Sequence, residues 1–271
     1  MIIGNAISPF ALRKKSNGGG GGTDADAQAF ITASGISGTE ATAVNTLVVS
    51  LKSANIWTKI KAAYPFVGSS ATSCKWNLKD ARDLDAAYRL FFNGGGTFSS
   101  AGYLPNGTNA YANTFLNPST QLTATSVHLS YYSRTATPVG ATVEIGNNNG
   151  SANIFHIRTA ANFIAGSSAT TLMNFTTTTN AQGFWLGTKR ANNDREIYRN
   201  GITQTTSTTN DTTAFTSVNL YLGATNQLGT TASYSNKQCA FASIGDGLTD
   251  AEVTAFYNAV QQFNTTLGRQ V

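Results

Sequence analysis

Charged side chains are scarce in this chain of 271 residues. Asp, Glu, Lys and Arg make up only 11% of it, and the net charge is +5. So little charge does not suit a helical enzyme or a disordered tail. The chain is rich instead in Thr, Asn and Ser and has 26 glycines, which is typical of many short strands joined by tight turns. Its length is enough for one large β-sandwich with appendages.

Cysteine and long apolar runs are also missing. Cys74 and Cys239 are too few for a disulfide framework, and no spacing of Cys and His indicates zinc. We expect two separate buried thiols, with a bridge between an early and a late strand as the alternative. No apolar run approaches the ~20 residues of a membrane span, and the first residues lack the layout of a signal peptide. We therefore expect no membrane insertion and synthesis in a cytoplasm.

The strand pattern is clearest in the last third of the chain. Strands are predicted there at 183–187, 195–199, 218–223 and 239–245. Asn200 and Gly201 are a strong hairpin signal, because both tolerate positive φ. Thr249 and Glu252 have the spacing of a capping box and predict a C-terminal helix that Gly268 ends.

Earlier segments alternate in the same way. Further strands are predicted at 88–92, 127–132, 143–146, 154–158 and 163–165. The spacing of these segments is that of a β-sandwich. The sequence thus predicts two sheets back to back between Cys74 and Ile244, with helices on the outside.

The N-terminal quarter has a different pattern. Residues 1–22 are predicted to be an apolar arm with a glycine linker, either a tether to a neighbouring subunit or a floppy terminus. Its basic trio, residues 13–15, lacks interleaved aromatics, so no nucleic acid is expected. Residues 23–65 are predicted to be helices packed on a sandwich at 66–271. Their signals are an Asp24 cap with a Gly35 stop, a capping box at Ser37 and Glu40, and a third helix over 56–64 ended by Pro65.

The C-terminal pattern resembles concanavalin A-like jelly rolls of laminin-G type. In those domains one strand ends in Tyr-x-Asn-Gly, another ends in Leu-Gly-Ala, and Leu-Thr-x-x-Glu follows the last strand. The matching residues are Tyr198, Asn200, Gly201, 222–224, Leu248, Thr249 and Glu252. The resemblance implies a mainly β, concanavalin A-like two-sheet jelly-roll sandwich with an N-terminal helical segment and a C-terminal helix. It implies a fold more firmly than an activity.

The N-terminal part resembles virion proteins of tailed bacteriophages, in which a segment like 24–31 precedes a jelly roll of this type. The likeness continues through 43–49, 56–59, 74–79, 85–90 and 104–111, and with the C-terminal pattern it covers most of 24–267. It brings no catalytic motif and no cofactor. It implies a structural or adhesive role on a virus particle, with other virion subunits as partners and a homo-oligomeric assembly.

Catalytic groups are not expected. Glycan hydrolases on this fold place two glutamates on one strand, but Glu40, Glu144, Glu196 and Glu252 lie far apart in sequence. His128 and His156 are predicted to face the surface from strands. A Ser/His/Asp triad is the alternative, although no Gly-x-Ser-x-Gly elbow is present.

Two turns contain oxygen ligands that could hold calcium. They are Asn192-Asn193-Asp194 and Asn210-Asp211, and ordinary turn chemistry is the favoured interpretation. The cations around the same hairpin are expected to protect a solvent-exposed sheet edge, with an anionic glycan or a neighbouring subunit as the alternative partner. These cations are Lys189, Arg190, Arg195 and Arg199.

Five tyrosines near strand ends or outward positions could stack on sugar rings. They are Tyr103, Tyr111, Tyr132, Tyr221 and Tyr234. Most are expected to be half-buried sandwich residues, and none is singled out as a site. Three hypotheses remain: a virion structural subunit held through its arm, an adhesin that binds host surface glycan and, least favoured, a glycan-cleaving enzyme.

Overall fold

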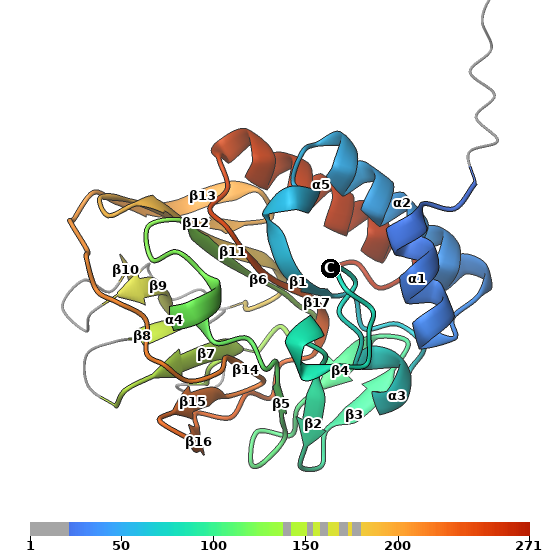
Figure 1. Ribbon diagram of the computed structural model, residues 1–271, viewed down its shortest axis with the longest axis horizontal. Coiled ribbons are helices and arrows are strands. Elements are labelled where there is room, and N and C mark those ends of the chain that lie inside the picture. Colours follow the sequence, from blue (N-terminus) through green and yellow to red (C-terminus); the bar gives the residue numbers. More distant parts are fainter. Residues whose placement is uncertain (1–21, 138–141, 151–153, 158–161, 168–172, 175–179) are drawn as a thin grey trace, which may run out of the picture.

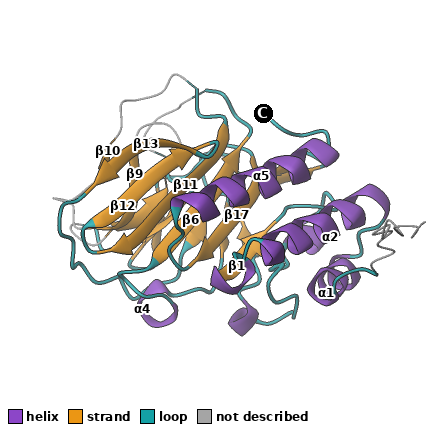
Figure 2. Cartoon of the chain, turned by 90° about the horizontal axis from the view of Figure 1, so that it is seen from above, coloured by secondary structure: helices purple, strands orange, loops and turns teal. Residues whose placement is uncertain are grey.

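The computed structural model describes residues 22–271 except 138–141, 151–153, 158–161, 168–172 and 175–179. The predicted arm, apart from Gly22, lies outside the described residues. Two β-sheets stack on each other, and a layer of helices covers one of them (Figures 1 and 2). The predicted mainly β, two-sheet sandwich is confirmed. Within the described part of the chain, no helix is long and apolar enough to span a membrane.

The first sheet has the order β13-β12-β11-β6-β17-β4-β3, and β1 pairs with β17. Its strands are β1 (Ile60–Tyr64), β3 (Thr97–Ser99), β4 (Gly102–Leu104), β6 (Val127–Ser133), β11 (Gly183–Ala191), β12 (Asp194–Arg199), β13 (Ile202–Ser207) and β17 (Cys239–Gly245). The β12–β13 turn has φ of 51° at Asn200 and 73° at Gly201, so the hairpin predicted from these two residues is confirmed.

The second sheet has the order β10-β9-β8-β7-β14-β5-β2, and β15 pairs with β7 and β16. Its strands are β2 (Phe91–Asn93), β5 (Tyr111–Asn113), β7 (Ile145–Asn148), β8 (Ile154–Ile157), β9 (Asn162–Ser167), β10 (Met173–Asn174), β14 (Tyr221–Leu222), β15 (Thr225–Gln227) and β16 (Thr230–Ala232). Two predicted strands are shorter than expected. Tyr88 is left-handed with φ of 59°, so β2 begins only at Phe91, and of 218–223 only β14 is a strand.

The long helices are α1 (Ala25–Ser34), α2 (Gly38–Ser53) and α5 (Asp250–Thr266), and they form a third layer on the outer face of the first sheet (Figure 2). The short helices α3 (Ala71–Cys74) and α4 (Pro118–Gln121) lie in connections between strands. One apolar core joins the long helices to Phe184 and Phe241 of the sheet, and a second core, around Leu129, Trp185 and Leu222, lies between the sheets. The first sheet is therefore buried on both faces.

Local signals correctly predict the ends of two helices. The carboxylate of Asp24 accepts the Asp26 N–H at 3.0 Å, and Gly35 ends α1 with φ of 71°. Thr249 and Glu252 form the predicted capping box of α5. The box predicted at Ser37 is wrong, because Ser37 makes no side-chain capping bond. Glu40, its expected partner, instead accepts the Gly68 N–H at 3.0 Å.

The third helix predicted over 56–64 is also wrong. After a single 3-10 turn, η1 (Trp57–Lys59), the chain becomes strand β1 and pairs antiparallel with β17. This pairing satisfies the backbone groups of an apolar segment against a strand from the far end of the chain. The first sheet therefore begins at Ile60, inside the region predicted to be helical.

The two cysteines are free and buried. Cys74 lies in α3 and not in a strand, and its thiol donates to the Val67 carbonyl at 3.3 Å. The Cys239 thiol on β17 donates to the Phe241 carbonyl at 3.4 Å. The expectation of two separate buried thiols is confirmed, and the alternative of a bridge is wrong.

Arg269 fastens the end of the chain to its N-terminal part. Its buried guanidinium donates to the carbonyls of Pro65 at 2.6 Å, Phe66 at 2.9 Å and Ala240 at 2.8 Å, and to the side chain of Asn264 at 2.8 Å. Helix α5 packs beside α2. Arg269 thus ties the segment after α5 to the residues that follow β1 and to β17 of the first sheet.

Candidate functional site

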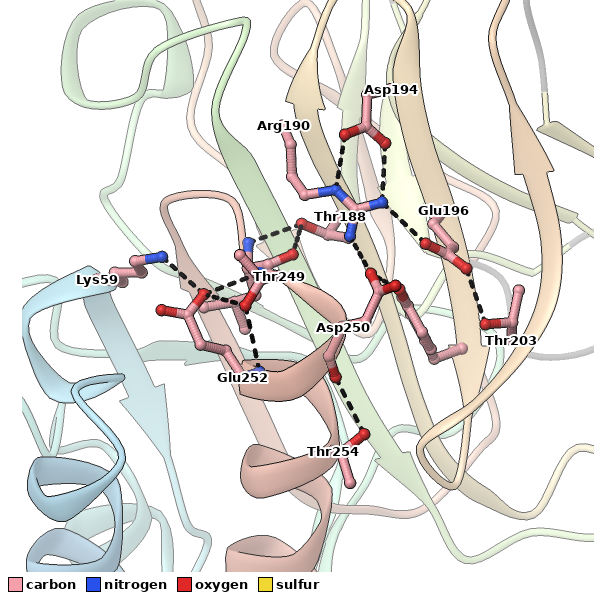
Figure 3. A network of polar contacts seen from close by, with 12 residues as sticks. Lys59, Thr188, Arg190, Asp194, Glu196, Thr203, Thr249, Asp250, Glu252 and Thr254 are labelled. Atoms are coloured by element: carbon pink, nitrogen blue, oxygen red, sulfur yellow. Dashed lines mark hydrogen bonds and ion pairs between the residues drawn. The ribbon is translucent and has the colours of Figure 1, made fainter.

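The hairpin that the sequence marked as cationic contains a polar network centred on Arg190 (Figure 3). Arg190 of β11 donates to Asp194 at 2.8 and 2.9 Å and to Glu196 at 2.9 Å, both on β12. It also pairs with Asp250, the first residue of α5. Thr203 of β13 donates to Glu196 at 2.8 Å. The network therefore joins three adjacent strands to the start of the C-terminal helix.

One carboxylate of this network, that of Asp250, is unsuited to acid catalysis. Hydrogen bonds from Tyr198 and Arg190 lower the pKa of the Asp250 carboxyl, whereas a glycosidase acid needs a raised pKa. Two of the glutamates outside the network have separate partners. Glu144 pairs with buried Lys237 at 3.1 Å, and Glu252 pairs with Lys59 at 2.7 Å (Figure 3).

Two of the four cations predicted to protect a sheet edge are buried instead, and that prediction is wrong for them. The Lys189 ammonium lies 3.6 Å and the Arg195 guanidinium 3.3 Å from the carboxylate of Asp211, and all three side chains are inaccessible. These side chains are buried because the segment around Asp211 packs over the ends of β11 and β12. The Asp211 N–H donates to the Asn192 carbonyl there at 2.9 Å. Arg199 lies over the ring of Trp185 at 5.1 Å.

The same contacts bear on the two calcium turns. Asp194 and Asp211 direct their carboxylates at protein cations, so the ligands with formal charge are already paired. Over the described residues, no group of three or more His, Cys, Asp or Glu side chains is placed to hold a metal ion. The geometry favours turn chemistry at both places.

His128 is completely buried, so the prediction that it faces the surface is wrong. Helix α5 covers it, with the Phe256 ring at 5.9 Å. Its Nδ1 lies 2.6 Å from the Asp246 carbonyl and its Nε2 3.1 Å from the Ser243 hydroxyl. A carbonyl only accepts, so Nδ1 carries the hydrogen and Nε2 of the neutral ring accepts from Ser243. A Ser/His pair does exist here, but no substrate can reach it.

His156 on β8 is also buried, with 5% of its surface exposed, so the same prediction is wrong for it. The strand pattern did place both histidines on strands, β6 and β8. Alternation identifies which side chains share a face of a strand. It does not reveal whether another layer covers that face.

Three of the five candidate tyrosines gather on the protein surface. The rings of Tyr111 and Tyr221 stack with centroids 4.6 Å apart and an interplanar angle of 27°. Tyr234, from the segment after β16, is tilted beside Tyr111 at 6.4 Å. All three are half-buried. Tyr132 is buried in the core under the helices and Tyr103 in the core between the sheets, so neither can stack on a sugar ring.

These tyrosines lie on the outer face of the second sheet. Ala112, Leu222 and Phe92 point into the core between the sheets, so their neighbours along β5, β14 and β2 point outward. Across the strands Tyr221 is opposite Asn113, which is opposite Phe91, and Tyr111 is opposite Asn93. We call this set the tyrosine face: Phe91, Asn93, Tyr111, Asn113, Tyr221 and Tyr234. The long helices pack on the other sheet (Figure 1).

The loops beside the tyrosine face are tightly hydrogen bonded. The side-chain oxygen of Asn106 accepts three consecutive backbone N–H groups, of Thr108, Asn109 and Ala110, each at 3.0 Å. The Gly107 N–H donates to the Ser235 carbonyl at 2.9 Å, which joins the loop before Tyr111 to the residue after Tyr234. The segments that carry Tyr111 and Tyr234 are thus bonded to each other, and Tyr221 stacks on Tyr111.

A pocket of about 260 Å³ opens beside Phe91. It is lined by Ala71, Thr72, Lys75, Arg89, Leu90, Phe91 and Phe92. Lys75 pairs with Asp83 at 2.6 Å, and Arg89 pairs with Asp85 at 2.8 Å. Sequence reasoning missed the pocket and did not single out Phe91, although the alternation predicted over 88–92 puts Phe91 on the face opposite Leu90 and Phe92.

Solved structures with this fold include carbohydrate-associated domains. Domain 4 of AbnA, a GH43 extracellular arabinanase from Geobacillus stearothermophilus in complex with arabinotriose, is 12% identical, with a TM-score of 0.51 over 73% of this chain and 98% of that domain. Another is a structure of botulinum neurotoxin type C, a toxin whose cell entry depends on interaction with two ganglioside molecules. It is 14% identical, with a TM-score of 0.51 over 77% of this chain and 53% of that one.

A third similar structure is the binding domain of botulinum neurotoxin DC in complex with rat synaptotagmin II. It is 15% identical, with a TM-score of 0.50 over 76% of this chain and 52% of that one. The chain thus spans about half the length of the two toxin structures. Such identities show the fold alone and confirm the predicted jelly roll. No sequence-family model and no curated protein matches the chain.

Proposed function

We propose that this chain is a non-enzymatic glycan-binding protein and that it binds sugar through the tyrosine face. The observation that carries the proposal is the cluster of Tyr111, Tyr221 and Tyr234 on the sheet face away from the long helices. Sugar rings have apolar faces that stack on aromatic side chains, and amides such as that of Asn113 can bond their hydroxyl groups. Two of the similar folds belong to proteins that bind a sugar ligand, arabinotriose or gangliosides, which supports this choice.

The absence of catalysis is part of the proposal. It is supported by the separate ion pairs of Glu144 and Glu252 and by the lowered pKa of Asp250. Cleavage of a glycosidic bond needs a proton donor and a second carboxylate at a short, defined separation. The tyrosine face has neither, because its side chains are aromatic rings and amides.

The test of glycan binding uses the full chain, because β1 lies outside the range first predicted for the sandwich. On a glycan array, Tyr111→Ala and Tyr221→Ala are each expected to weaken binding about fivefold to tenfold, the value of one aromatic contact. Tyr111→Phe keeps the ring and is expected to bind nearly normally. The matched control is Ile202→Ala, an exposed site on the edge of the other sheet. If no glycan binds at high protein concentration, the proposal is wrong.

The setting we propose for this binding is a bacteriophage virion, where the chain is a tail or head-surface subunit and recognises host surface glycan. The support is the sequence resemblance over most of 24–267 together with the apolar arm and glycine linker of residues 1–22. An arm on a flexible linker can bind a neighbouring subunit while the domain stays free to reach a ligand. Other virion subunits and further copies of this chain are the proposed partners.

Deleting residues 1–22 tests the virion role separately from glycan binding. The truncated protein is expected to fold and to bind glycan as the full chain does, but to be lost from assembled particles. Incorporation is measured by quantitative mass spectrometry of purified virions, with thermal unfolding as the control for folding. Normal incorporation of the truncated protein would show that the arm is no tether.

A further inference from the structure

We infer that the sugar-binding surface extends past the tyrosines, across Phe91 and into the adjoining pocket, and that its ligand is an uncharged glycan of several units. This inference rests on the proposed function and specifies its ligand class. We call the extended surface the binding strip. It runs from Tyr221 over Asn113 to Phe91 and ends in the pocket between α3 and β2.

The strip is continuous because its side chains are direct neighbours across three strands. Tyr221, Asn113 and Phe91 are opposite one another on β14, β5 and β2. Neighbouring strands are about 4.8 Å apart, so this row is about 10 Å long before the pocket begins. One strand spacing is close to the length of one sugar unit in an extended chain. A single sugar would therefore leave most of the strip unused.

Phe91 is the residue that joins the two parts. Its side chain is 51% exposed, and it lines the pocket on one side and the row of cross-strand neighbours on the other. Its neighbour Phe92 points inward and packs edge-on against Phe98 at 4.7 Å. The backbone of β2 is thus fixed by the core while the Phe91 ring stays in solvent, where it offers a third stacking surface after Tyr221 and Tyr111.

The charges along the strip indicate the ligand class. The tyrosine face has only aromatic and amide side chains. The pocket contributes Lys75 and Arg89, but Asp83 and Asp85 pair with them, so two positive and two negative charges sum to zero. An acidic sugar would find no excess positive charge, and it would approach two carboxylates that are about half exposed. A neutral sugar can use the ammonium, guanidinium and carboxylate groups as donors and acceptors for its hydroxyls.

The experiment uses ladders of neutral arabino-, gluco- and galacto-oligosaccharides of increasing length, with oligogalacturonates as the acidic series. Affinity is measured by calorimetry on the full chain and is expected to rise with length up to about three sugars, since the strip is about two strand spacings plus a pocket. Phe91→Ala is expected to weaken binding of the longer neutral sugars about fivefold and to leave the shortest unchanged. Raising salt from about 50 to about 500 mM is expected to change neutral-sugar affinity less than about twofold.

Each alternative has its own signature. If the tyrosine variants lose binding and Phe91→Ala loses none, the strip ends at the tyrosines; the extension is then wrong and the glycan-binding function stands. If oligogalacturonates bind more tightly, with salt dependence and loss in Lys75→Gln, the pocket is an anion site and the neutral class is wrong. If no member of either series binds, the proposed function and this extension fail together. Ile202→Ala and thermal unfolding of each variant control for folding.

Discussion

His128 illustrates how burial alone can make a single side chain sensitive to acid. The ring lies under α5 with both nitrogens engaged, and burial lowers its pKa from 6.5 to about 4. Between these two values the unfolded chain binds a proton that the folded protein does not. The stability contributed by the neutral ring is therefore full above about pH 6.5 and is lost as the pH falls toward 4.

This difference gives a prediction for pH dependence. Between pH 7 and pH 5 the wild-type protein is expected to lose about 2 kcal/mol of unfolding free energy through His128. His128→Gln is expected to be less stable at pH 7, because its packing is disturbed, but to lack this part of the acid loss. Urea unfolding of both proteins at the two pH values measures the difference. Equal losses in the two proteins would contradict the assignment.

Single residues also show where sequence reasoning about the site stops. Tyr111, Tyr221 and Tyr234 were among five candidates of the same chemical kind, and only the structure separates them from buried Tyr103 and Tyr132. Periodicity says that two side chains share a face of a strand, but not what packs on that face. Lys189 and His128 were placed in solvent for the same reason, and both are buried.

Among the elements, α5 and the β12–β13 hairpin were predictable because their signals are local. Thr249 with Glu252, and Asn200 with Gly201, work through contacts with near neighbours in sequence. Strand β1 was not predictable in the same way. Its pairing partner β17 is remote in sequence, and that pairing outweighs the helical spacing of its apolar residues.

The N-terminal caps of α5 and α2 provide a matched pair for mutation. Thr249→Ala removes the hydroxyl that accepts the Glu252 N–H at 3.3 Å and is expected to cost about 1 kcal/mol. Thr249→Ser keeps an acceptor and should retain most of that stability. Ser37→Ala is the control, because Ser37 caps α2 without a side-chain bond, and it is expected to cost only about a few tenths of a kcal/mol.

Thermal or chemical unfolding of the three variants measures both effects in one series. A cost at Ser37 equal to that at Thr249 would mean that residue type, and not the observed capping bond, determines the loss. A negligible cost at Thr249 would mean that the contacts of Asp250 with Arg190 and Tyr198 hold the helix start on their own.

On the scale of the whole molecule, Arg269 connects parts of the chain that no local pattern links. Its guanidinium binds carbonyls before α3 and on β17, and burial lowers its pKa to about 10, so it stays charged at neutral pH. Its partners are carbonyls and the Asn264 amide. Replacing Arg269 leaves several buried acceptors without donors, and this lowers the free energy of unfolding.

Arg269→Met is therefore expected to lower the unfolding free energy by about 3 kcal/mol or more. Arg269→Lys restores a charge but not the planar fork and should recover only part of the loss. Gln270→Ala, at the exposed next residue, is expected to have no measurable effect. Denaturant unfolding of the three variants checks the order, and a stable Arg269→Met would show that the helical layer needs no such fastening.

The two-sheet sandwich itself was predictable from alternating segments and from the resemblance to jelly rolls. The layer order was not, because it depends on which outer surface the three long helices cover. Sequence patterns gave each helix an apolar side, and both sheets offered a surface to receive it. In the folded protein the helices cover the first sheet, because α5 packs against strands of that sheet.

The helical cover on one sheet also separates the side chains that stabilise the fold from the side chains that we propose to bind sugar. Both apolar cores lie on one side or the other of the first sheet, so the outward side chains of the second sheet contribute little to keeping the chain folded. Related sequences could exchange these side chains freely, one ring or amide at a time, and acquire new binding preferences with little risk of unfolding. A saturation library limited to outward positions of β2, β5 and β14 should accordingly yield mostly folded proteins with divergent ligand preferences.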